Sequence, residues 1–556
     1  MLRQPPSRET TVRSGVPAGA ILLGFLVVAS AALFVPVLKG YWLADDFDWV
    51  KDFYRYPWSD TLRLFVADWS RAVAQEYRPL WAASFIVDLR LWGLSPVALH
   101  LTNLGLHLVA CLLVWLLAAS VPGADRLAAP LATAFFALAP LHAEPVCWIS
   151  ARGHILAPIF IMACIVLLRR FERIGHRWSY LASLGCALAA FATQEVAAAL
   201  PPLLLLRDVV DAPRRDRPWL RRLIFLHAPF WATLAGYLAF RYLRFGMLGR
   251  PDTFSSIPTL LHGVYAALRV LWLSPITFAA LPGGSAARLI KAALCLLAVS
   301  ILLAPLFASR AGGRADFARG LTFFAGLWPL VCTAVLFGAA SQRHFYLATV
   351  GPAVAMGLAG SGLLASGPAV ARAAAVALAL LLADSGLGLA SSVAPYARSG
   401  RLSWQIARQV DLALEAAGRD PESVTVIIAE FPDRRAVFWD YFYPGALEPP
   451  FRSGRPPRAV LPSFTTCHCP PEEWKAQNAA LLARLAEGSV SRVYVVIWDA
   501  TQSRFVTRSL RPMEFWDDGY AAATGPIPRP VPSEGHPYRG EDRKLRLTYT
   551  GRSPFR

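Results

Sequence analysis

Two adjacent aspartates, Asp45 and Asp46, directly follow the first long apolar run of the sequence. A carboxylate can take the proton of an attacking hydroxyl and so act as a general base. Arginines near the later apolar runs can supply fixed positive charge to a phosphate. Acids and arginines together suit a substrate that has an anionic head and an apolar tail.

Further polar clusters lie beside or inside apolar runs, where ionisable groups are costly and usually face a cavity, form pairs or serve function. Their candidate substrate-binding residues are Arg78, His142, Glu144, Arg152, His154, Glu195, Arg343 and His344. Simpler interpretations stay open: the aspartates could be solvated loop acids, Glu195 a hairpin-tip charge and Arg343 a snorkelling boundary residue. For His100, Asn103 and His107, which share one helical face, we favour hydrogen bonds between helices.

Long uncharged runs must position these clusters. Of the 556 residues, 55% are hydrophobic and 17% are charged, against about 25% charged in an ordinary globular protein. The composition indicates an α-helical polytopic membrane protein and excludes a disordered chain, a disulfide-rich secreted scaffold and a cytosolic enzyme. Most of the net charge of +18 lies in short loops, where the topology rule explains it, so we expect no nucleic-acid partner.

Candidate membrane spans follow one another along the chain. A span needs about 20 apolar residues, and about eleven runs qualify, although several are short. The first run is too long for a signal peptide, so we interpret it as an uncleaved span with a cytoplasmic N-terminus. The runs are 14–38, 97–118, 127–141, 155–168, 178–193, 195–210, 221–242, 289–308, 320–339, 345–363 and 370–393.

Arginine-rich loops at 169–177, 207–222 and 310–319 set the orientation, because such loops stay in the cytoplasm. This placement puts every polar cluster on the outer side. Segment 258–281 holds two prolines and an arginine, and we interpret it as an interfacial or re-entrant piece, which keeps the number of spans odd. We therefore expect a multi-pass protein of the plasma membrane, a bacterial inner membrane, with an extracytoplasmic C-terminal domain.

The character of the sequence changes near residue 397. Short β-branched runs at Val424–Ala429 and Val493–Trp498 alternate with helical stretches at 402–417 and 471–487, a pattern typical of a small α/β domain. We divide the chain into a transmembrane catalytic domain at 1–396, with its first outer loop at 40–95, and an extracytoplasmic α/β domain at 397–556. Cys467-His468-Cys469 is a weak zinc signal without a second ligand pair, and a loop with two thiols is preferred.

The acid pair after the first span resembles the paired acidic motif in the first outer loop of GT-C glycosyltransferases. The run YRPL, followed further on by LWGLSPVALHLTNLGLHLVACLLVWLL, resembles the corresponding region of bacterial relatives of the TMTC-type O-mannosyltransferases. The same holds, in the same order, for PLHAEPVCWISARGHILA, ATQEVAAALPPLLLLRD and SQRHFYLATVG. The resemblance covers residues 17–395.

This resemblance implies a reaction. Enzymes of the family transfer a sugar from a polyprenyl-phosphate-linked donor to an acceptor on the non-cytoplasmic face. By resemblance, Asp45 corresponds to the general base, which deprotonates the acceptor hydroxyl for an inverting displacement, and Asp46 orients the site or shares that role. Arg343 and Arg152 correspond to basic positions near the lipid phosphate. The implied partners are the donor lipid, a glycan, lipid or protein acceptor, and the bilayer.

The sequence departs from the family pattern at three places. Gln194 stands where relatives usually have Lys, Gly153-His154 stands where they often have Lys-Asp, and tetratricopeptide repeats are absent from this sequence. We expect no obligatory metal, because arginines can stabilise a phosphate leaving group, although Asp45, Asp46 and Asp48 could hold Mg²⁺ or Mn²⁺. Two alternatives remain: a transporter or flippase of an amphipathic anionic lipid, and a catalytically inactive scaffold whose cavity is closed or whose acids are paired to arginines.

Overall fold

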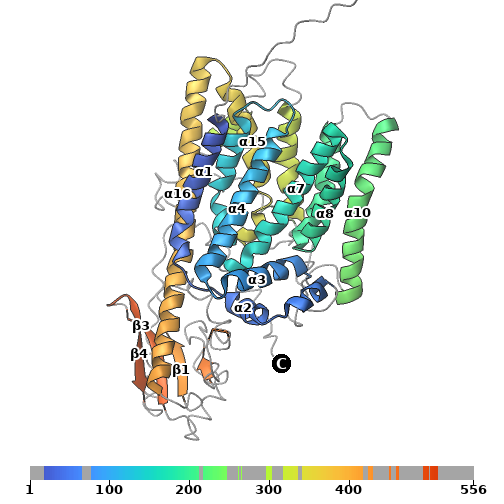
Figure 1. Cartoon of the computed structure of the whole chain (residues 1–556). Helices are drawn as coiled ribbons and strands as arrows, with labels where there is room; N and C mark the ends of the chain where they lie inside the picture. The colour runs from blue at the N-terminus through green and yellow to red at the C-terminus, as the bar shows by residue number, and fades with distance from the viewer. Residues whose placement is uncertain are drawn as a thin grey trace, which may run out of the picture.

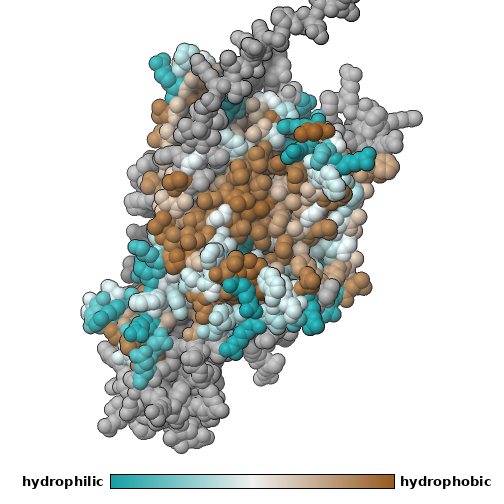
Figure 2. Space-filling model, viewed as in Figure 1, coloured by the Kyte–Doolittle hydropathy of each residue, from teal (hydrophilic) through white to brown (hydrophobic). Residues whose placement is uncertain are grey.

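The computed structural model describes residues 18–65, 77–211, 217–246, 261, 265, 293, 296–303, 317–335, 341–417, 424–429, 450–451, 459–461, 492–499 and 501–510. Apolar helices pack side by side into a bundle (Figure 1). A hydrophobic band covers the middle of the face in Figure 2, and hydrophilic residues gather towards both ends. Four helices of the described part are long and apolar enough to cross a membrane: Pro96–Ala119, Ile149–Ile174, Phe317–Ala334 and Pro368–Ala413. The helical architecture is confirmed, and the number of spans stays a prediction.

Helices follow the predicted apolar runs along the chain. The longer ones are α1 Ala18–Leu38, α3 Pro79–Trp92, α4 Pro96–Ala119, α5 Ala128–Ala137, α7 Gly153–Ile174, α8 Arg177–Phe191, α9 Leu200–Asp211, α10 Arg217–Phe245, α15 Val350–Leu364 and α16 Pro368–Ala417. The shorter ones are α2 Asp46–Tyr54, η1 Trp58–Phe65, η2 Pro140–His142, α6 Ala143–Cys147, η3 Ile149–Arg152, η4 Glu195–Ala199, η7 Thr322–Leu327, α14 Trp328–Ala334 and η8 Gln342–Phe345. Apart from residues 261 and 265, segment 258–281 lies outside the described residues.

Small residues let the inner helices approach closely. A Cβ placed on Gly357 of α15 would clash with the carbonyl oxygen of Ala128 and with Ala132, both on α5. A Cβ on Gly351 would clash with the backbone of η7 and with Trp328. Such close backbone approach is how helices associate in a bilayer, where lipid is as apolar as the side chains.

The long helix α16 links the bundle to a sheet at its end. It runs beside α1 and continues past the bundle to β1, β3 and β4 (Figure 1). The helices predicted separately at 370–393 and 402–417 are thus one helix, and the predicted boundary at 396/397 falls inside it. Gly400 of α16 lies against Gly40 so closely that a Cβ on Gly400 would clash with the Gly40 backbone. Ser403 Oγ donates to Trp42 O at 2.5 Å, which ties α16 to the start of the first outer loop.

The sheet has four strands in the order β2-β1-β3-β4. They are β1 Val424–Ala429, β2 Ala459–Leu461, β3 Arg492–Asp499 and β4 Arg504–Leu510. Strand β1 pairs in parallel with β2 and β3, and β4 is antiparallel to β3. Both predicted strands are confirmed. The helix predicted at 471–487 and the Cys467-His468-Cys469 cluster lie outside the described residues.

Candidate active site

The predicted polar clusters gather at the end of the bundle where α2 and α3 lie (Figure 1). Arginines of the predicted cytoplasmic loops lie at the other end, beside the C-terminus of α4. There Arg169 Nη1 donates to Leu117 O at 3.3 Å, and Arg173 Nη2 donates to Ser120 O at 2.5 Å. The structure therefore places the predicted polar clusters and the arginines of the 169–177 loop at opposite ends of the bundle. Which side of the membrane each end faces stays a prediction.

A tight turn between α1 and α2 positions the two aspartates. Ala44 has a φ of 48°, in the left-handed region, where a residue with a Cβ is strained by about 1–3 kcal/mol. The turn closes where Asp46 N donates to Leu43 O at 2.9 Å and Leu43 N donates to Asp46 Oδ2 at 3.0 Å. Asp45 therefore lies at the N-terminal end of α2, and Asp46 is the first residue of that helix.

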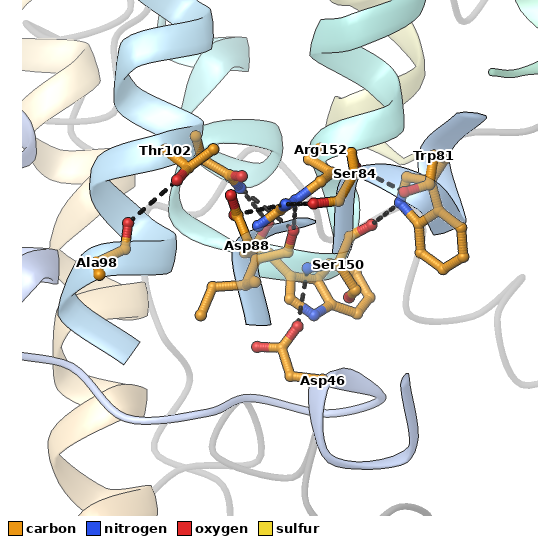
Figure 3. A network of polar contacts seen from close by, with 11 residues as sticks. Asp46, Trp81, Ser84, Asp88, Ala98, Thr102, Ser150 and Arg152 are labelled. Atoms are coloured by element: carbon orange, nitrogen blue, oxygen red, sulfur yellow. Dashed lines mark hydrogen bonds and ion pairs between the residues drawn. The ribbon is translucent and has the colours of Figure 1, made fainter. Parts of the chain in front are cut away.

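Ser150 of η3 binds both carboxylates. Its backbone N–H donates to Asp46 Oδ1 at 2.8 Å (Figure 3), and its hydroxyl donates to Asp45 Oδ1 at 2.6 Å. The indole N–H of Trp49 donates to Asp45 Oδ2 at 3.1 Å. All these donors are uncharged. Among the residues that the structure describes, neither aspartate forms an ion pair.

Burial raises the pKa of both carboxyl groups. The Asp46 side chain is fully buried, and its burial together with the charge of Asp45 raises its pKa to about 7. Burial also raises the pKa of Asp45, against which hydrogen bonds from Ser150 and Trp49 and the charge of Arg343 act. A carboxylate with a raised pKa is more basic than a solvated one, so this pair suits proton transfer closer to neutral pH.

The short helix η3 is held firmly in place. Trp81 Nε1 donates to Ser150 O at 3.0 Å (Figure 3). Asn103 Nδ2 donates to Trp148 O at 3.1 Å and to Ile149 O at 3.3 Å. These contacts come from α3 and α4, so both helices fix the residue that binds the acid pair.

Arg152 anchors the far end of η3 and is fully buried. Its Nη1 forms an ion pair with Asp88 Oδ2 at 2.7 Å (Figure 3), and its guanidinium lies 4.2 Å from the centroid of the Phe85 ring. Although the resemblance places Arg152 near a phosphate, its side chain presents no surface to a ligand in this conformation. Sequence reasoning does not single out Asp88, because it lies in a predicted outer loop without a nearby motif.

Arg343 lies beside Trp148, just before η3, and is partly exposed. Its backbone N–H donates to Glu144 Oε2 at 2.9 Å, and its Nη1 donates to Glu144 Oε1 at 2.6 Å. The guanidinium lies 4.7 Å from the centroid of the Trp148 ring. Since Trp148 is two residues before Ser150, Arg343 and Asp45 border the same short stretch of chain.

A second pair of arginines meets Glu195 in η4. Arg78 Nη2 lies 2.8 Å from Glu195 Oε2, and Arg241 Nη1 lies 3.3 Å from Glu195 Oε1. Two guanidinium groups on one carboxylate leave a net positive charge. The sequence prediction includes Arg78 and Glu195 and misses Arg241, which lies inside a long apolar run on α10.

His154 and His344 connect these two groups. Gln194 Nε2 lies 2.9 Å from His154 Nδ1, and the rings of His154 and His344 are 4.8 Å apart. Ser341 Oγ lies 2.6 Å from His344 Nδ1. The family resemblance implies Lys at 194 and Asp at 154. Gln194 and His154 contact each other, so the two positions where the sequence departs from the family pattern lie together.

His142 lies deeper in the bundle and is fully buried. Its Nε2 lies 2.8 Å from Thr349 Oγ1, and His107 Nδ1 lies 2.7 Å from Tyr346 OH. Asn103 binds the backbone at the start of η3, so the hydrogen bonds between segments that we favour are confirmed for Asn103 and His107. They are wrong for His100, whose ring nitrogens are buried and form no hydrogen bond within the described part of the chain. The contacts of His142 and His107 fasten the segment after Arg343 to the bundle.

Asp45, Asp46 and Asp48 do not point their carboxylates at one common position where a metal ion could bind. Within the described ranges, no group of three His, Cys, Asp or Glu side chains is arranged to hold a metal ion. Both oxygens of Asp45 and of Asp46 accept hydrogen bonds, and Asp48 Oδ1 instead lies 3.9 Å from Lys51 Nζ. The three aspartates therefore do not fit Mg²⁺ or Mn²⁺ in this arrangement, and we derive no step through a metal.

Comparisons with known proteins agree with the motif-level resemblance. No family model matches the chain. A Drosophila melanogaster protein named protein O-mannosyl-transferase Tmtc1 is 30% identical over 141 residues, which are 25% of this chain and 16% of that protein. The Mus musculus protein O-mannosyl-transferase TMTC1 is 31% identical over 199 residues, 34% of this chain and 19% of that protein. The matches thus span less than a fifth of these relatives, and the predicted resemblance is confirmed over those segments.

Solved structures with a similar course of the chain include ArnT from Cupriavidus metallidurans bound to undecaprenyl phosphate. It has a TM-score of 0.46 and 15% identity, over 89% of this chain and 98% of that one. The oligosaccharyltransferase AglB from Archaeoglobus fulgidus has a TM-score of 0.47 and 13% identity, over 86% of this chain and 69% of that one.

Proposed function

We propose that the chain is an integral-membrane glycosyltransferase that uses a polyprenyl-phosphate-linked sugar. The observation that carries the proposal is a pair of buried or partly buried carboxylates, Asp45 and Asp46, held by neutral donors near Arg343 at one end of an apolar bundle. The partial match to proteins named O-mannosyl-transferases supports a hexose as the transferred sugar.

Asp45 is the general base of the proposed reaction. The acceptor hydroxyl gives its proton to a carboxylate oxygen of Asp45, and the hydroxyl oxygen forms a bond to the anomeric carbon of the donor sugar. The bond between that carbon and the phosphate oxygen breaks, and the lipid phosphate leaves with the bonding electrons. This single displacement inverts the anomeric configuration. Asp46, whose pKa is about 7, adjusts the charge beside the base as the proton arrives.

Arg343 binds the leaving phosphate in this proposal. The guanidinium has five N–H donors, and its contact with Glu144 uses Nη1. Stacking on Trp148 fixes the plane of the guanidinium before the donor arrives, and preorganised donors are the usual way to stabilise a developing anion. Arg78, partly exposed beside Glu195, adds positive charge on the same side. Arg152 supports η3 instead of touching the phosphate.

The arginine-rich loops support the location that belongs to this proposal. The acid end faces the extracytoplasmic side, the N-terminus is cytoplasmic, and the protein sits in a bacterial inner membrane. The acceptor is a hydroxyl of a glycan, lipid or protein that reaches this side. The sheet lies at the same end as the acids, because Tyr494 and Val496 of β3 share one buried cluster with Trp42 and Phe47.

The test is sugar transfer by the purified full-length chain in nanodiscs, with radiolabelled undecaprenyl phosphate mannose as the donor and delipidated envelope glycans as acceptors. Asp45→Asn keeps the shape and removes the base, so transfer should fall by about 10²–10⁴ while donor binding persists. Asp60→Asn, in an exposed pair with Arg63 in the same outer loop, is the matched control and should retain transfer. Near-normal transfer by Asp45→Asn would refute the assignment. Donor movement across the bilayer that is insensitive to this change, without transfer, would support a transporter.

A further inference from the structure

We propose that Ser150 is a positioning residue that gives the two aspartates different tasks, with its hydroxyl holding Asp45 as the proton acceptor and its backbone N–H holding Asp46 in place. The inference rests on the proposed function, because it deepens the description of the same site. It starts from the observation that one residue donates to both carboxylates, at 2.6 Å from Oγ to Asp45 Oδ1 and at 2.8 Å from N to Asp46 Oδ1.

The two bonds differ in what they permit. A backbone N–H cannot turn away, so Asp46 Oδ1 is held in every protonation state. A hydroxyl rotates, so it can donate to the ionised carboxylate of Asp45 and accept a hydrogen bond once that carboxylate is protonated. A hydrogen bond donated to an ionised group is stronger than one between neutral groups. Ser150 thus favours the charged form of Asp45, which is the form that can take a proton.

Ser150 can do this only if its own position is fixed. Trp81 donates to its carbonyl oxygen, and Asn103 donates to the two carbonyls before it. The buried Arg152–Asp88 pair holds the residue that ends η3 (Figure 3). Since α3, α4 and the ion pair all hold this segment, η3 forms a rigid edge against which the acid pair is set.

Other charges also act on Asp45 and set the background for a titration. Asp46 is adjacent, and Arg343 lowers the pKa of Asp45 from η8. The titratable groups on the neighbouring elements are Asp48, Lys51 and Asp52 on α2, Asp88 on α3, His100 on α4, Glu144 on α6, Arg152 on η3 and His154 on α7. Ser150→Ala leaves all these charges unchanged and keeps the N–H that binds Asp46. Loss of a donor to the ionised form raises the pKa of a carboxyl group, so Asp45 should take up its proton at a higher pH.

The experiment is an infrared titration of the full-length chain in nanodiscs, following the C=O band of the protonated carboxyl that disappears in Asp45→Asn. In Ser150→Ala the midpoint should rise by about one pH unit or more, the scale set by a hydrogen bond to a charged group. Ser150→Thr should restore the midpoint. Ser84→Ala is the matched control: the Ser84 hydroxyl donates to Trp81 O in the same network and touches neither acid, so the midpoint should not move.

A second measurement separates the inference from the proposed function. With undecaprenyl phosphate mannose as the donor, the acid limb of the rate–pH profile in Ser150→Ala should move upward by the same amount, with recovery at higher pH. An unmoved titration midpoint in Ser150→Ala, beside an inactive Asp45→Asn, would overturn the inference alone. An active Asp45→Asn would overturn the proposed function and leave the titration result standing. Where Ser150→Ala does not insert, Ser150→Cys keeps the size and donates only weakly, and it should move the midpoint in the same direction.

Discussion

The two ends of the helical bundle differ in the groups that contact their buried carboxylates. At the end away from the aspartate pair, Arg207 Nη2 contacts Glu172 Oε1 and Asp208 Oδ1, both at 2.5 Å. His227 Nε2 lies 2.8 Å from the other oxygen of Asp208. Each of these carboxylates meets a basic group, so the cluster is closed, and it ties α7, α9 and α10 together.

At the end with the aspartate pair, some carboxylates form ion pairs with arginines and others accept hydrogen bonds from uncharged donors. Three pair with arginines: Glu144 with Arg343, Glu195 with Arg78, and Asp88 with Arg152. Asp45 and Asp46 are instead held by backbone, hydroxyl and indole donors. A nearby cation stabilises the ionised carboxylate and lowers its basicity, whereas burial with neutral donors preserves it. The comparison therefore separates carboxylates that fasten the fold from the pair suited to accept a proton. Pairing of acids with arginines, one of the two features expected of an inactive scaffold, is not seen for Asp45 and Asp46 in the described part of the chain.

The largest expected effect is all-or-none and tests whether the two ends face opposite sides. Cysteines introduced at Ser59, in the first outer loop, and at His176, in the arginine-rich loop after α7, should react with an impermeant maleimide from opposite sides of sealed vesicles. Ser59→Cys should react from the outside and His176→Cys from the inside. Cys467 and Cys469 are replaced by serine in both variants to remove background. Labelling of both sites from one side would show that the two ends do not face opposite sides of the membrane, and the predicted topology would be wrong.

The next effect concerns stability. Arg207→Met removes the cation shared by Glu172 and Asp208 and leaves Asp208 with His227 alone of the basic groups described above. Removal of one partner from a buried ion pair typically costs about 3–5 kcal/mol. The thermal unfolding midpoint in detergent should fall clearly. Arg173→Met, an exposed residue at the same end, is the control and should change it little.

Asp45→Asn should behave in the opposite way in the same assay. It removes a partly buried charge that has no arginine partner among the described residues, so the midpoint should stay or rise. A fall as large as that of Arg207→Met would show that Asp45 fastens the fold, and the distinction between the two ends would disappear.

The helices could be predicted from sequence because long apolar runs carry their own signal. The same signal led to a predicted boundary at 396/397, because the sequence becomes more polar near residue 397, where the chain leaves the bundle. The helix α16 nevertheless continues to Ala417. Polarity reports the environment of a residue, and helical geometry persists when that environment changes. The strands at Val424–Ala429 and Arg492–Asp499 could be predicted because their β-branched runs are short and distinct from the apolar helices.

The candidate site could be predicted as a set of residues but not as a set of pairs. Each of Arg152, Arg343 and Arg78 is recognisable as a cation beside an apolar run. Which carboxylate each one meets depends on tertiary packing between segments far apart in sequence, such as the 199 residues that separate Glu144 from Arg343. Ser150 lies in the motif PLHAEPVCWISARGHILA but is not among the predicted site residues, because a single serine carries no charge and no spacing signal.

The last prediction concerns Arg343, the partly exposed arginine that we assign to the donor phosphate. Arg343→Ala removes charge-assisted hydrogen bonds to the phosphate, each typically worth about 1.5–3 kcal/mol, so affinity for undecaprenyl phosphate mannose should fall by about 10–100-fold. Arg343→Lys should recover only part of that loss, because an ammonium group neither reproduces the planar fork nor stacks on Trp148 in the same way.

The removal of Arg343 also leaves Glu144 without its partner, and a bare carboxylate would itself repel the phosphate. Glu144→Gln combined with Arg343→Ala separates these causes: affinity that returns to normal in the double variant would mean that Arg343 only neutralises Glu144. Affinity that stays low would mean that the guanidinium itself binds the phosphate. Arg90→Ala, an exposed arginine of α3 that donates to Tyr56 O, is the matched control for loss of one positive charge at this end and should bind the donor normally. Unchanged affinity in both single variants of Arg343 would transfer the phosphate-binding role to Arg78, whose pairing with Glu195 is the alternative cationic group on the same side.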